Sequence, residues 1–314
     1  MKQLQAYLTT FTIIAILTIA SGCASGGNSA SSDSADPDQK ADQTQSPANP
    51  NMPNPPRTNE STVLKQDEEA AAPGNGNEDD KQTNPPAAPV QAAPKKLYRM
   101  NSVYSFVPIN KEATTGKVVL LTFDDGPKAD KTLGSLLDTL DKHHAKAIFF
   151  VNGYRVKTHP ELLEKIADRG QTIGNHSWDH IDLKKEKEAT VKKQIGDVQA
   201  IVKKITGKYP RFFRPPFGSG NDAVKKLVRN DGMLYMTWSN GSLDWDSSTK
   251  NKPDKVIANV LDQLHPGVNI LMHELPWTTE ALDSLLTKLE AKGYGFIDPS
   301  TIELGLDSPQ KSAK

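Results

Sequence analysis

Between about residues 98 and 306, short apolar runs alternate with stretches of helical period, and no other feature constrains the fold as strongly. Such alternation is typical of a parallel sheet covered by helices, so the sequence predicts an α/β fold, either a barrel or a doubly wound sheet. This part of the chain is long enough to bury one sizeable core. The expected strands are Val118–Phe123, Ala147–Val151, Thr172–Asn175, Arg211–Arg214, Met233–Trp238, Val268–Met272 and Gly295–Ile297.

The segments between these strands carry apolar residues at helical spacing. Four leucines fall within residues 133–140, and a second apolar set within 162–166 follows Pro160, a residue type favoured in the first turn of a helix. Further helices are expected at Lys184–Thr206, Ala223–Asn230, Pro253–Leu264 and Thr279–Lys292.

The N-terminal residues have the pattern of an export signal. An apolar run from about residue 8 to 20 is shorter than the roughly 20 residues that a membrane span needs, and small residues follow it. Cys23 is the single cysteine of the 314 residues, so no disulfide can form within the chain. The stretch from Ile19 to Cys23 resembles a bacterial lipobox, which implies a lipoprotein signal over residues 1–23, a lipid on Cys23 and a location on the outer face of the cell membrane. The alternative is an ordinary signal peptide with an incidental cysteine.

Residues 24–97 form a polar, proline-rich segment. They hold eleven of the 22 prolines and no aromatic residue, and eleven acidic against six basic side chains give them a net charge of −5. A segment with so little apolar bulk cannot offset the entropy lost on ordering, so we expect a disordered spacer. We expect residues 98–306 to form one domain and residues 307–314 a flexible tail.

Polar residues follow five of the expected strands at the point where each ends. They lie in "TFDDGP" (122–127), "HSWDH" (176–180), "RPPFG" (214–218), "SLDWDS" (242–247) and "LMHE" (271–274). In both candidate architectures, functional groups gather at the carboxyl ends of the parallel strands. We therefore expect these five motifs to meet at one end of the sheet.

The first two motifs suggest a metal site. Adjacent carboxylates such as Asp124 and Asp125 repel one another unless a cation lies against them. His176 and His180 are four residues apart, which on a helical turn places both imidazoles on one side. With Asp125 they would form a two-histidine, one-carboxylate set for zinc or a related metal, leaving Asp124 as a base for a bound water. Taken singly, the histidine pair could be structural and the aspartates part of a turn.

The other motifs supply groups that could complete such a site. His273 ends another expected strand and could deliver a proton to a departing nitrogen near neutral pH. Asp244 could hold the tautomer of this imidazole or pair with Arg214, for which a solvated ion pair is the plainer interpretation. Trp245 and Phe217 could be core residues or aromatic platforms for a sugar. The remaining histidines are given no role: His143, His144, His159 and His265.

These motifs, in this order and at this spacing, resemble those of the polysaccharide deacetylases, carbohydrate esterase family four, whose domain is also called the NodB-homology domain. The similarity covers about residues 118–297 and includes "TFDDGP", "HSWDH", "RPPFG", "LDW" and "LMH". It implies a deformed (β/α) barrel of about seven parallel strands. Two positions depart from the family's pattern, because Phe217 stands where many members have Tyr and Glu274 stands where Asp is common.

The resemblance also implies a role for each motif residue. Asp124 would be the general base and His273 the general acid. A divalent metal, most often Zn²⁺ with Co²⁺, Ni²⁺ or Mn²⁺ as alternatives, would be bound by Asp125, His176 and His180. The supporting residues would be Arg214 orienting Asp124, Pro216 and Phe217 lining the groove with the Phe217 N–H as an oxyanion donor, Asp244 and Trp245 supporting and walling the site, and Leu271 lining the acetyl pocket.

The expected function is therefore a metal-dependent N-deacetylase of a cell-wall polysaccharide in a Gram-positive-type bacterium, with the N-acetylglucosamine of peptidoglycan as the first candidate substrate. N-acetylmuramic acid, chitin oligomers, poly-N-acetylglucosamine and acetylxylan are alternatives, as is a catalytically silent wall-binding module. We expect a monomer. Nucleic-acid binding is not expected, because the sequence has no basic stripe with interleaved aromatic residues.

Overall fold

The computed structural model describes residues 94–306. These residues belong to one compact unit. The expected signal segment with Cys23, nearly all of the expected spacer and the expected tail lie outside the described residues. Within residues 94–306, no helix has the length and apolar character needed to cross a bilayer.

The main sheet is parallel throughout, with seven strands in the spatial order β7-β6-β5-β4-β3-β9-β8 and β10 paired beside the start of β3. The strands of this sheet are β3 (Val118–Gly126), β4 (Ala147–Val151), β5 (Thr172–Asn175), β6 (Phe212–Phe213), β7 (Leu234–Tyr235), β8 (Asn240–Gly241), β9 (Val268–His273) and β10 (Gly295–Phe296).

The sheet is curled into a partly closed barrel. Its two edge strands, β7 and β8, are consecutive along the chain and are joined by residues 236–239 only. Seven strands laid flat would separate the edges by about 29 Å, because neighbouring strands lie about 4.8 Å apart. The chain from Tyr235 to Asn240 can span at most about 18 Å even when it is fully extended. The short connection therefore requires a curved sheet, which agrees with the barrel that the sequence motifs imply.

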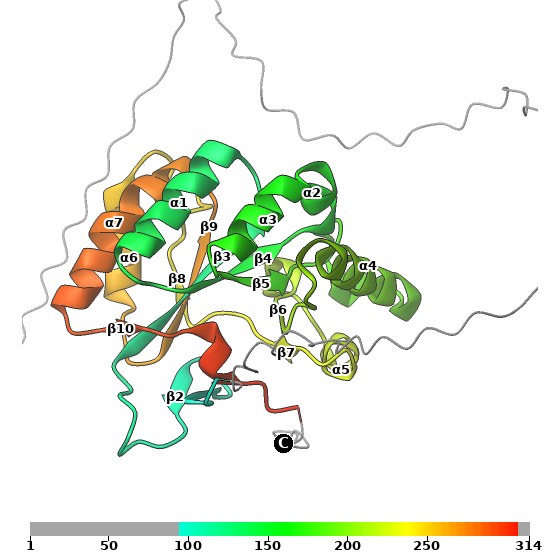
Figure 1. Ribbon diagram of the computed structural model, residues 1–314, viewed down its shortest axis with the longest axis horizontal. Coiled ribbons are helices and arrows are strands. Elements are labelled where there is room, and N and C mark those ends of the chain that lie inside the picture. The colour runs from blue at the N-terminus through cyan, green and yellow to red at the C-terminus, as the bar shows by residue number, and fades with distance from the viewer. Residues whose placement is uncertain (1–93, 307–314) are drawn as a thin grey trace, which may run out of the picture. The chain divides into compact units, whose positions relative to one another are not determined.

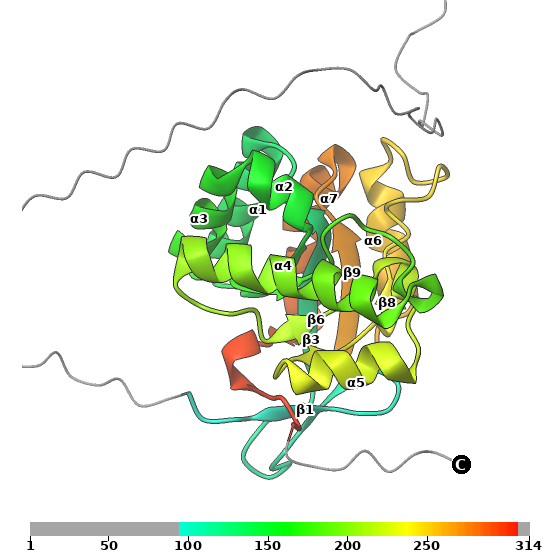
Figure 2. The same cartoon turned by 90° about the vertical axis from the view of Figure 1, so that its right-hand side faces the viewer.

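Helices cover the outer face of this sheet (Figures 1 and 2). They are α1 (Asp130–Lys142), α2 (Gly153–Thr158), α3 (Pro160–Asp168), α4 (Glu188–Thr206), α5 (Asp222–Asn230), α6 (Pro253–Asp262) and α7 (Pro276–Ala291). Figure 1 shows α1 and α7 side by side, and Figure 2 shows α4 running across the molecule with α5 next to it. Three of the helices begin with proline, which lacks the N–H that would have no partner there.

The alternation of side chains along β3 separates the core from the functional face. Val119, Leu121 and Phe123 pack with the covering helices in one apolar cluster. Leu120 belongs to a second cluster with inward-facing residues of β4 and β6. Because successive strand residues point to opposite faces, Asp124 is directed to the inside of the barrel. Burial on both faces explains why β3 reads as a continuous apolar run.

A small second sheet closes the opposite end of the barrel. It has the order β11-β1-β2, formed by β11 (Ile302–Glu303), β1 (Tyr98–Met100) and β2 (Phe106–Pro108). Its apolar residues join the inner cluster, and the Phe106 N–H donates to the carbonyl of Gly267, at the start of β9. The carboxyl ends of the main strands are thus left as the end at which a site can form.

Several expected boundaries were wrong. The helix expected at Lys184–Thr206 begins at Glu188, after a separate 3₁₀ turn at Leu183–Lys185, and α7 begins at Pro276 rather than Thr279. The strands expected at Arg211–Arg214 and Met233–Trp238 shorten to two residues each. Helix α2 and the short strands β1, β2, β8 and β11 were not predicted, because they have too few residues for a periodic signal.

Candidate functional site

Asp124 and Asp125 end β3, and a break in the strand register brings both carboxylates to one place. Strand alternation alone would send them to opposite faces. The pairing of β3 with β4 shifts between Asp124 and Gly126, and Asp125 has a φ of 64° in the left-handed region. Such a bulge re-aims the side chain of the extra residue. As a result, the carboxylates of Asp124 and Asp125 approach the same Nε2 atom of His176, at 3.8 and 3.4 Å.

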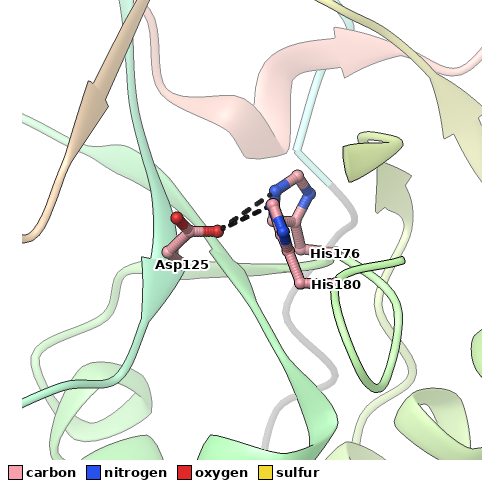
Figure 3. Close-up of side chains that lie close together, drawn as sticks. All are labelled: Asp125, His176 and His180. Atoms are coloured by element: carbon pink, nitrogen blue, oxygen red, sulfur yellow. Dashed lines mark ion pairs between the residues drawn. The ribbon is translucent and has the colours of Figure 1, made fainter. Parts of the chain in front are cut away.

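His176 and His180 face Asp125 from the loop that follows β5 (Figure 3). Their Nε2 atoms lie 3.4 and 3.2 Å from the same oxygen, Oδ1 of Asp125. The expected helical turn was wrong, because residues 176–182 are irregular and the left-handed φ values of Ser177 and His180 reverse the backbone instead. The two imidazoles still reach one side, by a loop geometry that no periodic pattern indicates.

The tautomer of His176 is set by the backbone. Its Nδ1 lies 2.7 Å from the carbonyl oxygen of Arg214, which can only accept, so Nδ1 carries a proton and Nε2 is the nitrogen that faces Asp125. Burial lowers the pKa of His180 in spite of the nearby Asp125 carboxylate. Nε2 of His176 is thus the nitrogen available to a metal, and a histidine binds a metal through an unprotonated ring nitrogen.

The three residues fit a divalent metal. One potential ligand atom from each of Asp125, His176 and His180 lies within 4.8 Å of the others. Tetrahedral zinc with ligands at about 2.0–2.2 Å requires ligand atoms about 3.3 Å apart, which the separations of 3.2 and 3.4 Å match. Oδ1 of Asp125 is buried and has no hydrogen-bond donor. A buried acceptor without a partner is costly, and a cation would satisfy it.

The charges of the site favour an ionised Asp125. Burial alone would raise the pKa of this carboxyl. Contact with His176 and the positive charges that His176, His273 and His180 carry when they are protonated outweigh burial and hold the pKa of Asp125 well below its usual range.

Asp124 is held by a fully buried arginine. Arg214 Nη1 donates to Oδ1 of Asp124 at 2.8 Å and to Oγ1 of Thr122 at 2.7 Å. Arg214 Nη2 donates to the carbonyl of Thr237 and to Oδ1 of Asn269, and the guanidinium lies 4.4 Å from the centre of the Phe150 ring. The contact between Arg214 and Asp124 resolves the alternative left open for Arg214, since its partner is Asp124 and not Asp244.

His273 lies opposite Asp124, because the register of β3 with β9 pairs these two residues. Its Nδ1 is 2.7 Å from Oδ1 of Asp244, so Nδ1–H donates to the carboxylate and Nε2 faces the site, 4.0 Å from Asp125. Burial alone would lower the pKa of His273, but the hydrogen bond and charge of Asp244, with the charges of Asp124 and Asp125, raise it. The imidazole is thus kept protonated to higher pH than a free histidine.

Aromatic and apolar side chains surround the polar groups. Phe217, 68 % exposed and with a φ of 59°, packs edge-on against His180 with 4.7 Å between ring centres. Trp245, 47 % exposed, packs edge-on against His273 at 5.3 Å. Pro216 and Leu271 are buried. Two exposed aromatic faces beside a polar centre are a surface on which a sugar ring can stack.

Several residues that hold these groups in place were not predicted from the sequence. Thr122 and Asn269 fix Arg214, and Thr278 donates to Oδ2 of Asp244 at 2.7 Å. Thr122 and Asn269 are polar residues within otherwise apolar runs, a signal that could have identified them. Glu274, which departs from the family's pattern, accepts hydrogen bonds from the N–H groups of Lys128 and Ala129. It therefore holds the loop after Asp125 rather than His273.

Several known proteins are similar to this chain. The family model described as polysaccharide deacetylase matches residues 111–236. The peptidoglycan-N-acetylglucosamine deacetylase PgdA of Listeria monocytogenes is 38 % identical over 212 residues, 67 % of this chain and 43 % of PgdA. The peptidoglycan-N-acetylmuramic acid deacetylase PdaC of Bacillus subtilis is 34 % identical over 66 % of this chain and 44 % of PdaC. The chain thus spans less than half the length of these two relatives.

Solved structures agree as well. The structure of PdaC is matched with a TM-score of 0.53 and 34 % identity over 60 % of this chain and 91 % of that one. The Bacillus anthracis protein BA3943, described as a family pseudoenzyme, is matched with a TM-score of 0.55 and 33 % identity over 57 % of this chain and 63 % of that one. Motifs, barrel and relatives agree, and the chain belongs to the polysaccharide deacetylase family, carbohydrate esterase family four.

Proposed function

We propose that this protein is a metal-dependent deacetylase that removes acetyl groups from N-acetylated sugars of a cell-wall polysaccharide, with the N-acetylglucosamine of peptidoglycan as the preferred target. One observation carries the proposal. Asp125 and His176 lie 3.4 Å apart, and three further groups lie within 4.0 Å of one or the other. These are the carboxylate of Asp124, which can act as a base, the imidazole of His180, which completes the potential metal-binding set, and the imidazole of His273, which can act as an acid. Metal-assisted amide hydrolysis uses a base, a metal ion and an acid at one place.

The base is Asp124. A divalent ion bound by Asp125, His176 and His180 would polarise the acetyl carbonyl and acidify a water molecule. Asp124 would accept a proton from that water as the water oxygen bonds to the acetyl carbonyl carbon, and Arg214 keeps the carboxylate of Asp124 oriented. Because Arg214 is fully buried and also bonded to Thr122, the base has little freedom to turn away from the site.

The acid is His273. Asp244 holds its Nδ1 proton, so the second ring nitrogen, Nε2, is the atom that delivers a proton to the departing sugar amine. Departure of the amine as a neutral leaving group breaks the C–N bond and releases acetate. The backbone N–H of Phe217, at the rim of the site, would donate to the oxygen on which negative charge develops.

Peptidoglycan is the proposed substrate because the relatives PgdA and PdaC are named for it, with N-acetylglucosamine and N-acetylmuramic acid as their respective targets. The exposed faces of Phe217 and Trp245 suit a sugar chain of either kind. We also propose that the protein is tethered by a lipid on Cys23 to the outer face of the cell membrane, within reach of the wall, and that it works as a monomer.

A catalytically silent wall-binding module is the second candidate, since the similar protein BA3943 is described as a pseudoenzyme. The presence of Asp124, the three potential metal-binding residues and His273 in one cluster argues against it. An assay separates the two. Purified protein is incubated with peptidoglycan fragments, chitin oligomers, poly-N-acetylglucosamine and acetylxylan, and mass spectrometry identifies the sugar that loses an acetyl group. Binding to wall fragments without any release of acetate would contradict the enzyme and favour the module.

Removal of the metal is expected to abolish acetate release. A bound divalent ion contributes several kcal/mol to the transition state, so the rate should fall by about 10³-fold after dialysis against a chelator. Adding Zn²⁺, Co²⁺, Ni²⁺ or Mn²⁺ in turn should restore the rate and identify the preferred ion. Circular dichroism of the chelated protein serves as the folding control. Undiminished activity of protein shown to be metal-free would refute the mechanism.

The pH profile should depend on Asp244. The rate should fall as pH rises through the pKa of His273, because the acid must be protonated, and the raised pKa places this limb above the usual range of histidine. Asp244→Asn removes the charge that raises this pKa, so the falling limb should move to lower pH. Profiles of kcat for both proteins, measured at saturating metal, check this. A limb that stays in place would exclude His273 as the titrating acid.

A further inference from the structure

Asn152 joins the two loops that carry the potential metal-binding residues. It lies between the end of β4 and the start of α2 and is only 1 % exposed. Its backbone N–H donates to the carbonyl of Gly126, the residue after Asp125, at 3.0 Å. Its side-chain Nδ2 donates to the carbonyl of His176 at 2.9 Å. One residue is therefore bonded to the backbone on both sides of the candidate metal centre.

The side chain of Asn152 does not do what an asparagine at this position usually does. It precedes α2 as the N-cap residue, where the Oδ1 atom of Asn normally accepts from an N–H of the first helical turn. No such cap bond is formed, and Oδ1 is buried without a hydrogen-bond partner. A buried acceptor in this state is destabilising, so the amide is poorly explained by the stability of α2.

The two residues after Asn152 also bond to the loop that carries His176 and His180. The N–H of Gly153 donates to Ser177 and that of Tyr154 to Trp178, at 3.1 and 3.2 Å. Gly153 packs directly under the Trp178 ring, where an added Cβ would lie 2.1 Å from a ring carbon. The loop between His176 and His180 is thus held against the start of α2, and the amide of Asn152 makes the contact nearest to His176 itself.

We propose that Asn152 is a positioning residue that sets the separation between Asp125 and His176 and thereby tunes the affinity for the metal. The inference rests on the proposed metal site. The backbone bond ties Asn152 to Gly126 and the side-chain bond ties it to His176, so loss of the side-chain bond alone lets the loop of His176 move independently of Asp125. Partners of this kind typically change metal affinity by about 10–100-fold when they are removed.

The test compares Asn152→Leu with a matched control. Leucine has a similar branched shape but cannot donate to the His176 carbonyl. The control is Asn240→Leu, because Asn240 is also 1 % exposed, also donates through Nδ2 to a backbone carbonyl, that of Val260, and also has a buried Oδ1 without a partner. Zn²⁺ affinity of each metal-free protein is measured by competition with a chromophoric chelator, and the unfolding free energy of each is measured in urea.

The expected result is a Zn²⁺ affinity about 10–100-fold weaker for Asn152→Leu and changed less than about threefold for Asn240→Leu. Equal affinity for Asn152→Leu and the parent protein would overturn the inference, as would an equal loss in the control. Asn152→Ser, whose hydroxyl is too short to reach the His176 carbonyl, decides the matter if the leucine variant does not fold. Failure of the parent protein itself to bind Zn²⁺ would instead refute the proposed function, so the two failures are distinguishable.

Discussion

Asp124→Asn is expected to lower kcat for acetate release by about 10²–10⁴-fold, the contribution of a positioned general base. An amide cannot accept the proton of the attacking water, and Arg214 then faces a neutral group. The fall should appear in kcat at saturating metal and substrate, because the residues proposed to bind the metal are intact. Acetate release from the fragments that the parent protein deacetylates measures it.

A nearby acidic residue provides the control for this variant. Asp179 lies in the same loop as His176 and His180, but its carboxylate accepts a hydrogen bond from Gln194 at 2.6 Å, away from the site. Asp179→Asn should leave kcat within about threefold, as expected of a surface change. If Asp124→Asn retained the parent rate, Asp124 would not be the base and the proposed mechanism would be wrong.

Arg214→Met is expected to lower the free energy of unfolding by about 3–5 kcal/mol, the cost of leaving a buried charge without its partner. Both groups are buried, with Arg214 0 % and Asp124 3 % exposed, so water cannot replace the lost contact. The change also removes donors to Thr122, Thr237 and Asn269. Urea unfolding of the metal-free proteins measures the effect apart from catalysis.

The double variant Asp124→Asn/Arg214→Met separates charge from packing. It should be more stable than Arg214→Met alone, because no uncompensated carboxylate remains, and the full cycle with Asp124→Asn and the parent protein gives the coupling energy between the two groups. Arg169→Met is the surface control. Arg169 pairs with Asp138 and Asp141 in solvent and should contribute about 1 kcal/mol or less. Equal losses for Arg214→Met and Arg169→Met would show that the buried pair does not stabilise the fold.

The local sequence pattern was sufficient to predict a continuous apolar strand. The bounds expected for β4 agree with the structure, since all five of its residues are buried, and those expected for β5 agree as well. β8 was missed because it consists of Asn240 and Gly241, which have no strand preference of their own. Its place in the sheet comes from pairing with β9, a contact that is distant in sequence.

The residues of the candidate site were predicted together, but the reasons for their positions were not. Asp125 was expected beside two histidines on a helical turn, whereas left-handed backbone at Asp125, Ser177 and His180 brings them together. Single positive φ values in non-glycine residues have almost no sequence signature and persist because the surrounding contacts impose them. Similarly, only the buried contacts decided that Arg214 pairs with Asp124 and Asp244 with His273.

The class of fold, the strands that end in reactive groups and the chemistry of those groups could all be predicted from residue types and their spacing. Residue type and spacing are local properties, and the carboxyl ends of parallel strands meet wherever such strands form one sheet. Only the tertiary structure decided that Asp124 lies opposite His273, that Asp125 turns back toward His176, and that Asn152 connects their loops. These are contacts between residues far apart in the chain. Their geometry follows from strand register and side-chain packing, which cannot be predicted from any short stretch of the sequence.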